Sequence, residues 1–382
     1  MPTTKPPTPT TALLRTLLPA LLLSALLLAT TTPSHAQSQN RTAIPDIDGF
    51  KTLQCDFHIH TVFSDGLVWP TVRPDEAFRE GLDGIAITDH IEYRPHRKDI
   101  PDASHNRSNE LAAPRAKALD IILIRGVEMT RNMPPGHFNA IFTQDSDALA
   151  KKDWRDSFAE AKRQNAFVIW NHPFWAAQQP NFTQWLPEHT EIHKNGWMHG
   201  IEIANANDYC PVAHQWCLDK KLTMIGNSDI HPPITFQVDF AKGEHRTITL
   251  VFAKNRTPAA IHDALKNRRT AVYYKEMLIG EEKYLRALYE KSVEVKSITR
   301  DGAKATVQLQ NNSGLTFQLK KTVPDEKISY FRDSEIKPHT RHTINITLPA
   351  DLPNAQINFE VSNLLIRPGK GLDYSYKLPD SK

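Results

Sequence analysis

The chain has 382 residues, of which 40% are hydrophobic and 23% charged, so its composition is globular and excludes a disordered or coiled-coil chain. This length allows about two or three domains. With 46 basic and 43 acidic residues the formal net charge is only +3, which argues against nucleic acid or an anionic membrane as a partner. Three cysteines exclude a disulfide scaffold, and we expect all three to be buried apolar groups. The 17 histidines point instead to metal binding.

Residues 1–36 are expected to be a signal peptide that is removed on export. Lys5 and Arg15 precede an apolar run from Leu17 to Ala29, and a small-residue cleavage site ends at Ala36. The run is too short for a spanning helix, so we expect no stable membrane anchor. The mature protein would be periplasmic or secreted and would carry 44 basic and 43 acidic residues.

Residues 37–270 alternate short apolar runs with amphipathic stretches. Such alternation predicts a parallel sheet covered by helices, and about seven or eight units in this length favour a (β/α) barrel. Ile121–Val127 and Phe138–Phe142 have no obvious helix between them, so a hairpin is expected there. The expected strands are Leu53–His58, Gly84–Thr88, Ile121–Val127, Phe138–Phe142, Phe167–Trp170, Gly200–Ala204, Leu222–Gly226 and Thr247–Phe252; the clearest helices are Pro74–Gly81, Trp154–Gln164, Pro211–Lys220 and Pro258–Asn267.

The C-terminal part has a different pattern. Residues 271–290 are expected to be a helical connector, and residues 291–382 a small all-β domain with a sandwich-like fold. No helical pattern interrupts its short β-rich runs. These runs are Val293–Ile298, Ala305–Gln310, Thr316–Leu319, Thr343–Leu348 and Gln356–Val361.

Histidines and carboxylates stand where the apolar runs of the barrel end. His58 and His60 are two residues apart on one strand, so their side chains leave on the same face and can bind one ion. In a parallel barrel all these run ends meet at the face where active sites form. A single strand-end histidine is more often structural, but burying so many polar groups without a metal would leave them unpaired. The set is His58, His60, Asp65, His90, Glu128, His137, His172, Asp229 and His231.

This ligand set contains nitrogen and oxygen donors and no thiolate, which suits Zn, Fe or Mn. Nine ligands exceed what one ion takes, so we expect about two or three divalent transition-metal ions. Asp89 lies beside His90 and is expected to orient a ligand from behind.

The order and rough spacing of these groups resemble the successive motifs of the polymerase-and-histidinol-phosphatase (PHP) metallohydrolase superfamily. The matching segments are His58-Ile59-His60-Thr61 with Ser64-Asp65-Gly66, Gly84 to Thr88-Asp89-His90, Glu128, Asn171-His172-Pro173 and Ser228-Asp229-Ile230-His231. The resemblance covers about residues 50–270, and within the superfamily it points to secreted bacterial phosphodiesterases of the Sb-PDE type.

The resemblance implies a distorted (β/α)7 barrel with a trinuclear metal centre. The implied ligands are His58, His60, Glu128 and Asp229 for the first ion, Glu128, His137 and His172 for the second, with Glu128 bridging, and Asp65, His90 and His231 for the third.

The function expected from the resemblance and the residues is that of a metal-dependent phosphoesterase, specifically a phosphodiesterase in which a hydroxide bridging the metal ions is the nucleophile. Its partner would be a small-molecule phosphoester, with Arg94, Arg97 and Arg131 binding the phosphate. A carbamate or carboxylic ester hydrolase on the same barrel is the alternative. A non-catalytic metal- or nucleic-acid-binding module is disfavoured, because structural metal sites close at four ligands per ion. The sequence carries no signal for an oligomeric state.

Overall fold

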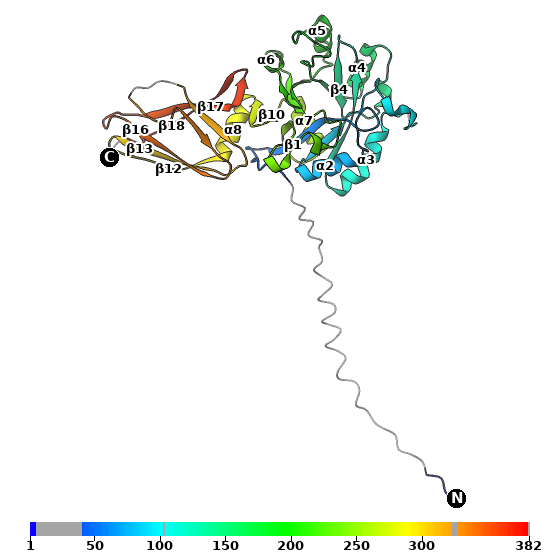
Figure 1. Cartoon of the computed structure of the whole chain (residues 1–382), viewed down its shortest axis with the longest axis horizontal. Helices are drawn as coiled ribbons and strands as arrows, with labels where there is room; N and C mark the ends of the chain where they lie inside the picture. Colours follow the sequence, from blue (N-terminus) through cyan, green and yellow to red (C-terminus); the bar gives the residue numbers. More distant parts are fainter. Residues whose placement is uncertain (5–39, 102–103, 323–326, 381–382) are drawn as a thin grey trace. The chain divides into compact units, whose positions relative to one another are not determined.

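The computed structural model describes residues 1–4, 40–101, 104–322 and 327–380, so most of the expected signal peptide lies outside the described residues (Figure 1). Residues Gln39–Lys382 form one compact unit. Within the described residues, no helix has both the length and the apolar character needed to cross a membrane. All three cysteines are free and buried, which confirms the prediction for them.

The first half of the mixed α/β domain follows the expected β-α alternation. β1 (Lys51–Ile59) pairs in parallel with β2 (Gly84–Ile87), and β2 pairs in parallel with β3 (Ile122–Thr130). The helices α2 (Val72–Glu80) and α3 (Arg107–Ala118) connect these strands. Each parallel step therefore has the crossover helix that it needs.

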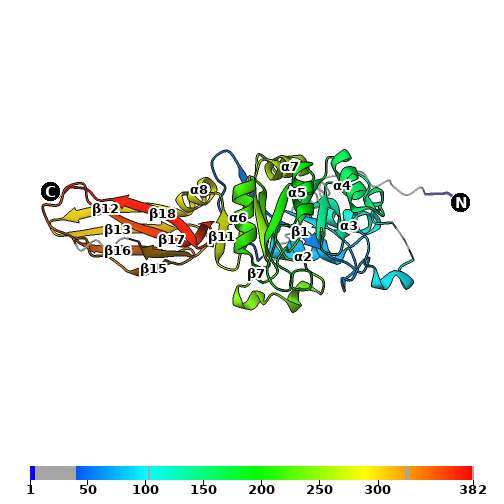
Figure 2. The same ribbon diagram turned by 90° about the horizontal axis from the view of Figure 1, so that it is seen from above.

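The second half of this α/β domain mixes pairing directions. β3 turns into β4 (His137–Ile141) as the expected antiparallel hairpin, and β4 pairs antiparallel with β5 (Phe167–Trp170). β6 (Gly200–Asn205) then pairs in parallel with both β5 and β8 (Thr223–Asn227). The helices around these strands in Figure 2 are α4 (Trp154–Arg163), α5 (Pro187–Lys194), α6 (Pro211–Lys220) and α7 (Pro258–Lys266). Shorter elements are β7 (Asp208–Tyr209), η1 (Pro95–Lys98), η2 (Asp147–Leu149), η3 (Ile234–Phe236) and η4 (Phe240–Lys242).

The last expected parallel strand runs the other way. β9 (Ile248–Ala253) pairs antiparallel with β1, because the chain between β8 and β9 contains only the short turns η3 and η4 and no crossover α-helix. The carboxyl ends of β1 and β8 still meet, through a parallel bridge between Ile59 and Ile230. This bridge brings the motifs that follow the two strands to one place.

The expectation of a helical connector over residues 271–290 was wrong in its first half. β10 (Thr270–Tyr274) and β11 (Met277–Gly280) form an antiparallel hairpin, and only α8 (Glu282–Ser292) is helical. The residues of β10 are β-branched or aromatic apart from one alanine, and all of them are buried. Lys275, in the turn, has a φ of 52°.

The C-terminal domain has two sheets, as the sandwich prediction requires. One has the order β12-β13-β16; in the other, β17 pairs with both β14 and β18, and β15 pairs with β14. β11 also pairs in parallel with β17. The strands are β12 (Val293–Asp301), β13 (Lys304–Asn311), β14 (Phe317–Lys321), β15 (Asp333–Ile336), β16 (Arg341–Thr347), β17 (Gln356–Arg367) and β18 (Lys370–Lys377).

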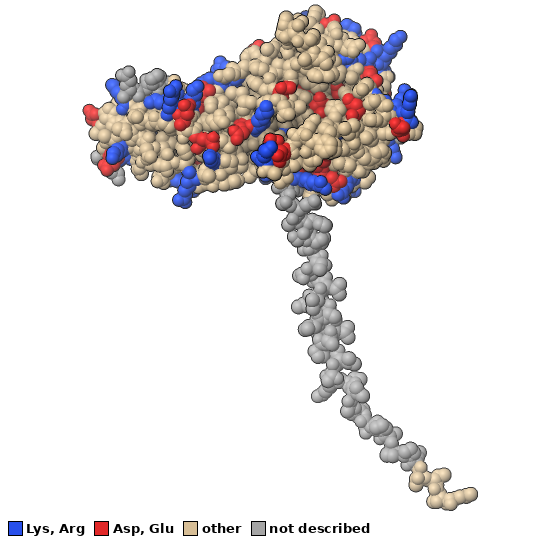
Figure 3. All heavy atoms as spheres, in the orientation of Figure 1, with Lys and Arg blue, Asp and Glu red and all other residues tan. Residues whose placement is uncertain are grey.

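Basic and acidic side chains are interspersed on the face drawn in Figure 3, in keeping with the near-balance of charge in the sequence. Blocks of one sign, which would attract a polyanion, are not evident on that face.

Candidate metal centre

The two histidines that end β1 point toward one carboxylate. The Nε2 atoms of His58 and His60 each lie 3.0 Å from Oδ1 of Asp229, which follows β8. Candidate ligand atoms of these three residues all lie within 4.8 Å of one another. The side chains of His58 and His60 are fully buried, so this convergence occurs where water cannot satisfy them.

Imidazole nitrogen atoms lie close to both carboxylate oxygens of Glu128, at the end of β3. Oε2 lies 3.2 Å from His58 Nε2, 3.4 Å from His60 Nε2 and 3.1 Å from His90 Nδ1. Oε1 lies 2.8 Å from His137 Nδ1. A carboxylate that faces different imidazoles with its two oxygens has the geometry of a bridging ligand.

His172 completes a second group with two of these residues. Candidate ligand atoms of His58, Glu128 and His172 also lie within 4.8 Å of one another. The predicted second set therefore lies together, because His137 contacts the same Glu128 carboxylate.

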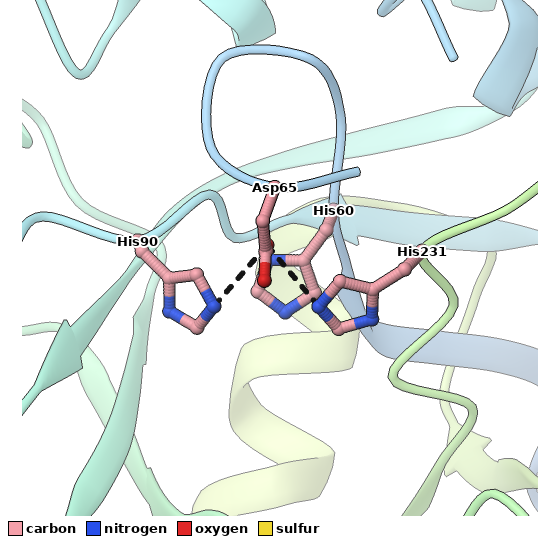
Figure 4. Close-up of side chains that lie close together, drawn as sticks. All are labelled: His60, Asp65, His90 and His231. Carbon is pink, nitrogen blue, oxygen red and sulfur yellow. Dashed lines mark ion pairs between the residues drawn. The ribbon is translucent and has the colours of Figure 1, made fainter. Parts of the chain in front are cut away.

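A further group surrounds Asp65 (Figure 4). Asp65 Oδ1 lies 3.3 Å from His90 Nε2 and 3.2 Å from His231 Nε2. His60 joins them, with its Nδ1 atom 3.9 Å from the same oxygen. The three residues that the resemblance assigned to a third ion are thus neighbours, and His60 lies between this group and the first.

The loop that carries Asp65 is held by Asp89. Its carboxylate accepts hydrogen bonds from Thr61 N at 2.7 Å, Thr61 Oγ1 at 2.8 Å and Ser64 Oγ at 2.8 Å. Gly66 closes the loop against the end of β1, where a Cβ atom would come within 2.6 Å of the backbone. Asp89 therefore lies behind the site and holds the loop, while its expected role in orienting a metal ligand stays a prediction.

Glu202 was missed by the sequence analysis, although it lies at the centre of the site. It is fully buried on β6 and accepts a hydrogen bond from His58 Nδ1 at 2.8 Å. It also accepts from the backbone N of His172 at 2.8 Å and from Asn227 Nδ2 at 2.8 Å. The only signal in the sequence is a carboxylate in the middle of the apolar run Gly200–Ala204, a run that otherwise predicts an ordinary buried strand.

Two of the candidate ligands lie on strained backbone. His172 has a φ of 26° and Asp229 a φ of 54°, a region that non-glycine residues seldom occupy. Buried Arg73 secures the neighbouring chain, because it donates to the carbonyl oxygens of His60 at 2.9 Å and His231 at 2.7 Å. Strain held in place by such bonds is typical of functional sites.

Burial and charge set the protonation of the cluster. Burial lowers the pKa of His58, but Asp229 and Glu202 outweigh it and raise that pKa well above its usual value. Burial, helped by two neighbouring imidazoles, lowers the pKa of His60 to about 4. Burial raises the pKa of Glu128, yet the surrounding imidazoles bring it well below its usual value. The carboxylates therefore stay ionised and ready to bind a cation.

The residues present fit bound metal ions. Several buried polar atoms at this site have no hydrogen-bond partner, and a buried polar atom without a partner costs about 1–3 kcal/mol. All of them are nitrogen or carboxylate oxygen atoms that transition metals accept. These atoms are His60 Nε2, Asp65 Oδ1, Glu128 Oε1, His137 Nδ1, His172 Nδ1 and Asp229 Oδ1.

The three arginines predicted to bind phosphate differ in their surroundings. Arg94 donates from Nε to the carbonyl of Phe63 at 3.1 Å, beside the Asp65 loop. Arg97 is exposed in η1. Arg131 pairs through Nε with Glu92 at 2.7 Å and donates to two backbone carbonyls, so most of its guanidinium is occupied. The role of Arg131 in phosphate binding stays a prediction and loses support.

Comparison with known proteins agrees with this description. An Ig-like domain family (DUF5001) matches residues 292–377. A two-domain protein from Bacteroides vulgatus, described as containing a predicted PHP-like metal-dependent phosphoesterase, is 54% identical, with a TM-score of 0.88. The match covers 90% of this chain and 100% of that one. No curated protein matches the chain.

Two weaker structural matches were also found. A candidate metal-dependent phosphoesterase from Bifidobacterium adolescentis is 16% identical, with a TM-score of 0.37 over 46% of this chain and 87% of that one. An amidohydrolase from Chromobacterium violaceum with bound sulfate and no metal is 16% identical, with a TM-score of 0.35 over 47% of this chain and 88% of that one. These values are too low to bear on fold or activity.

The fold and the clustered imidazoles and carboxylates define a two-domain protein of the metallohydrolase type. At the identity and coverage of the Bacteroides vulgatus protein, the chain belongs to the PHP-like family of metal-dependent phosphoesterases, with a C-terminal Ig-like domain.

Proposed function

We propose that the protein is an exported metal-dependent phosphodiesterase acting on small-molecule phosphoesters. The observation that carries the proposal is the convergence of six histidines and three carboxylates from separate strand ends, with unpartnered buried atoms on six of the nine. Two or three divalent transition-metal ions are proposed as cofactors. Bound there, they would supply Lewis acidity and water acidified for attack on phosphorus.

The protein's own residues hold this site in one arrangement. Glu202 fixes His58 by accepting from Nδ1, so His58 presents Nε2 to the cluster. Glu128 presents Oε2 to His58 and Oε1 to His137. Asp89 holds the loop that carries Asp65. These bonds are made before substrate arrives, so little reorganisation accompanies the reaction.

The charge of the loaded site favours an anionic substrate. Roughly four to six positive charges on the ions would face three ligand carboxylates, leaving a positive field for a phosphoester over a neutral ester. Arg94, which lies beside the Asp65 loop, is proposed to add a donor for a phosphate oxygen. Arg97, nearby in η1, is proposed to help bind the same group.

A panel of chromogenic phosphate mono-, di- and triesters, carboxylic esters and carbamates, run beside metal analysis, tests the proposal. We expect kcat/KM for diesters to exceed that for carboxylic esters, with two or three metal ions per chain. The Glu128→Ala protein, purified in the same way, is the control: loss of activity in this variant assigns the hydrolysis to this site. Equal or better turnover of neutral carbamates or carboxylic esters would overturn the proposal in favour of that alternative.

Two further expectations belong to the proposal. Export is supported by the charged, apolar and small-residue order of residues 1–36, and a mature N-terminus after residue 36 in a periplasmic or secreted fraction would test it. A distorted (β/α)7 barrel is supported by the meeting of β1 and β8 through the Ile59–Ile230 bridge.

A further inference from the structure

Two partly exposed aromatic side chains stand against the metal-ligand histidines. Trp175 is 47% exposed, and its ring centroid lies 5.4 Å from that of His172 and 5.5 Å from that of His137. Tyr93 is 52% exposed, and its ring centroid lies 5.9 Å from that of His90. Large apolar side chains scattered singly on a surface are ordinary, but these two adjoin one polar site.

The two rings flank a pair of imidazoles. The ring centroids of His90 and His137 are 6.0 Å apart, and Tyr93 contacts the first while Trp175 contacts the second. A phosphate bound to ions at these histidines would therefore have an aromatic surface on each side. Rings of this kind bind other flat rings by stacking or edge contact.

Tyr93 is exposed, but the chain that carries it is anchored. Ile91 N donates to the carbonyl of Glu128 at 2.9 Å. Glu92 Oε2 accepts from Thr130 N at 2.7 Å. Both bonds tie the segment before Tyr93 to the end of β3, so the ring keeps its place beside His90.

Trp175 is anchored in a similar way. Its backbone N donates to the carbonyl of His172 at 2.9 Å, and its carbonyl accepts from Gln178 N at 3.0 Å. The side chain of Gln178 donates through Nε2 to the carbonyl of Arg131 at 2.9 Å. The turn that carries Trp175 is thereby fixed to the segment after β3.

Arg131 touches both anchored segments, but only one of them through its side chain. Its Nε atom pairs with Glu92, next to Tyr93, at 2.7 Å, whereas its backbone carbonyl accepts from the side chain of Gln178, three residues after Trp175. The side chain therefore suits a residue that holds Tyr93 in place better than one that binds phosphate.

We infer that Trp175 and Tyr93 form the walls of a subsite for an aromatic ester group of the substrate, and that Arg131 is the positioning residue for the Tyr93 wall. The inference rests on the proposed function and narrows its substrate class to aryl phosphoesters. A stacked ring contributes about a three- to tenfold gain in affinity beyond that of the buried area alone.

The direct test is equilibrium binding of two phosphonates that cannot be hydrolysed. Phenylphosphonate and methylphosphonate share the charged group and differ in the ring. Titration calorimetry on the metal-loaded protein should show tighter binding of phenylphosphonate. Trp175→Ala and Tyr93→Ala should each reduce that preference by about three- to tenfold, mainly by weakening phenylphosphonate, and Trp175→Phe should retain most of it.

Phe182→Ala is the matched control. Phe182 is also an exposed aromatic residue, at 67%, but in the described part of the chain it makes no ring contact with the ligand histidines. This variant should keep the preference, and metal content should be equal in all variants. Equal weakening of both phosphonates by Trp175→Ala and Tyr93→Ala, or no preference in the unaltered protein, would overturn the inference.

Arg131→Ala separates positioning from phosphate binding. If the Arg131 side chain positions Tyr93, the variant should reduce the preference for phenylphosphonate about as much as Tyr93→Ala does, while methylphosphonate binding changes far less. Arg131→Lys should behave in the same way, since an ammonium cannot replace the planar guanidinium in these contacts. Equal loss for both ligands in Arg131→Ala, with recovery in Arg131→Lys, would mean that the charge binds phosphate and that the positioning role is wrong.

Kinetics keep this inference distinct from the proposed function. With phenyl 4-nitrophenyl phosphate, loss of a wall that only binds the ester group raises KM more than it lowers kcat. Hydrolysis of diesters without any preference between the phosphonates overturns the aromatic subsite alone. Failure to hydrolyse any phosphoester, with phenylphosphonate still preferred, overturns the proposed function alone.

Discussion

The PHP-like domain and the Ig-like domain bury their strands differently. In the PHP-like domain, every residue of β4, β5 and β6 is buried, because both faces of each strand are covered. In the Ig-like domain, β13 and β16 alternate between buried and more exposed residues, as strands with one solvent face do. Polar residues on the buried strands of the PHP-like domain therefore need a partner inside the protein.

The fate of buried polar atoms separates the two regions further. In the described residues of the Ig-like domain, 292–322 and 327–380, Ser292 Oγ is the only buried side-chain nitrogen or oxygen atom without a hydrogen-bond partner. Asn311, for example, donates to Leu315 O at 2.7 Å and accepts from Ser313 N at 2.9 Å. In the described residues of the PHP-like domain, six such atoms lie together at the candidate metal centre. Buried polar atoms therefore support the fold in the Ig-like domain, whereas those at the candidate metal centre are available to a ligand.

The largest expected effect is loss of Glu128. Glu128→Ala removes the carboxylate that faces imidazoles on both sides, so it should release more than one metal ion and lower kcat/KM by roughly ten-thousandfold, about 5 kcal/mol. Metal analysis and the ester panel measure both. The same loss should follow treatment with a chelator and be reversed by added metal. Full metal content in the variant would contradict a bridging role.

Truncation of one core side chain in the Ig-like domain should lower the stability of the protein without altering the candidate metal centre. Phe359, on β17, is fully buried and has its ring centroid 5.6 Å from that of Tyr376. Phe359→Ala should lower the free energy of unfolding by about 3–4 kcal/mol through lost burial and the cavity left behind. Denaturant unfolding measures this loss. Unchanged metal content and kcat/KM at low temperature are expected, and loss of metal would show that the two regions are coupled.

Acid should destabilise the PHP-like domain through its neutral buried histidines. Burial lowers the pKa of His189 and of His214 to about 4 each. An unfolded chain takes up protons below about pH 6.5 that the folded chain refuses, so this stability is present above that pH and falls as the pH drops toward about 4. Each group contributes up to about 3 kcal/mol. Unfolding measured from about pH 7.5 to about pH 5 should show the decline.

The pH prediction is tested with two matched histidine variants, one in the PHP-like domain and one in the Ig-like domain. His189→Gln should flatten the pH dependence, because His189 Nδ1 accepts from Leu186 N at 2.9 Å only while it is unprotonated, although Nε2 donates to Pro135 O at 2.8 Å in either state. His339→Gln, at an exposed residue of the Ig-like domain, should leave the profile unchanged. An equally steep decline in the His189→Gln protein would contradict the assignment.

The smallest expected effect is that of replacing Glu202. This buried carboxylate accepts hydrogen bonds from several residues of the site. Glu202→Gln keeps the size but weakens the hold on His58 Nδ1, so metal affinity or kcat/KM should fall by about ten- to a hundredfold. Competition with a chromophoric chelator measures metal affinity. Glu335→Gln, at an exposed carboxylate on β15, is the control, and equal behaviour of the two variants would remove Glu202 from the site.

Local sequence patterns were sufficient to predict most strands and part of the candidate metal centre. The apolar runs predicted most strands of the PHP-like domain within a few residues, because a strand buried on both faces is hydrophobic along its whole length whatever its partners are. His58 and His60 were predicted to share a face from their spacing alone, and both approach Asp229. The sandwich character of the C-terminal part followed from its lack of helical periodicity.

Tertiary structure decided what local pattern does not encode. The direction of β9 depends on how the chain returns after β8, and the partners of Arg131 come from three separate segments. Glu202 looks like any residue of an apolar run until β1 places His58 beside it. Spacing along one strand determines which side chains share a face, whereas contacts between strands exist only once the whole sheet has closed around them.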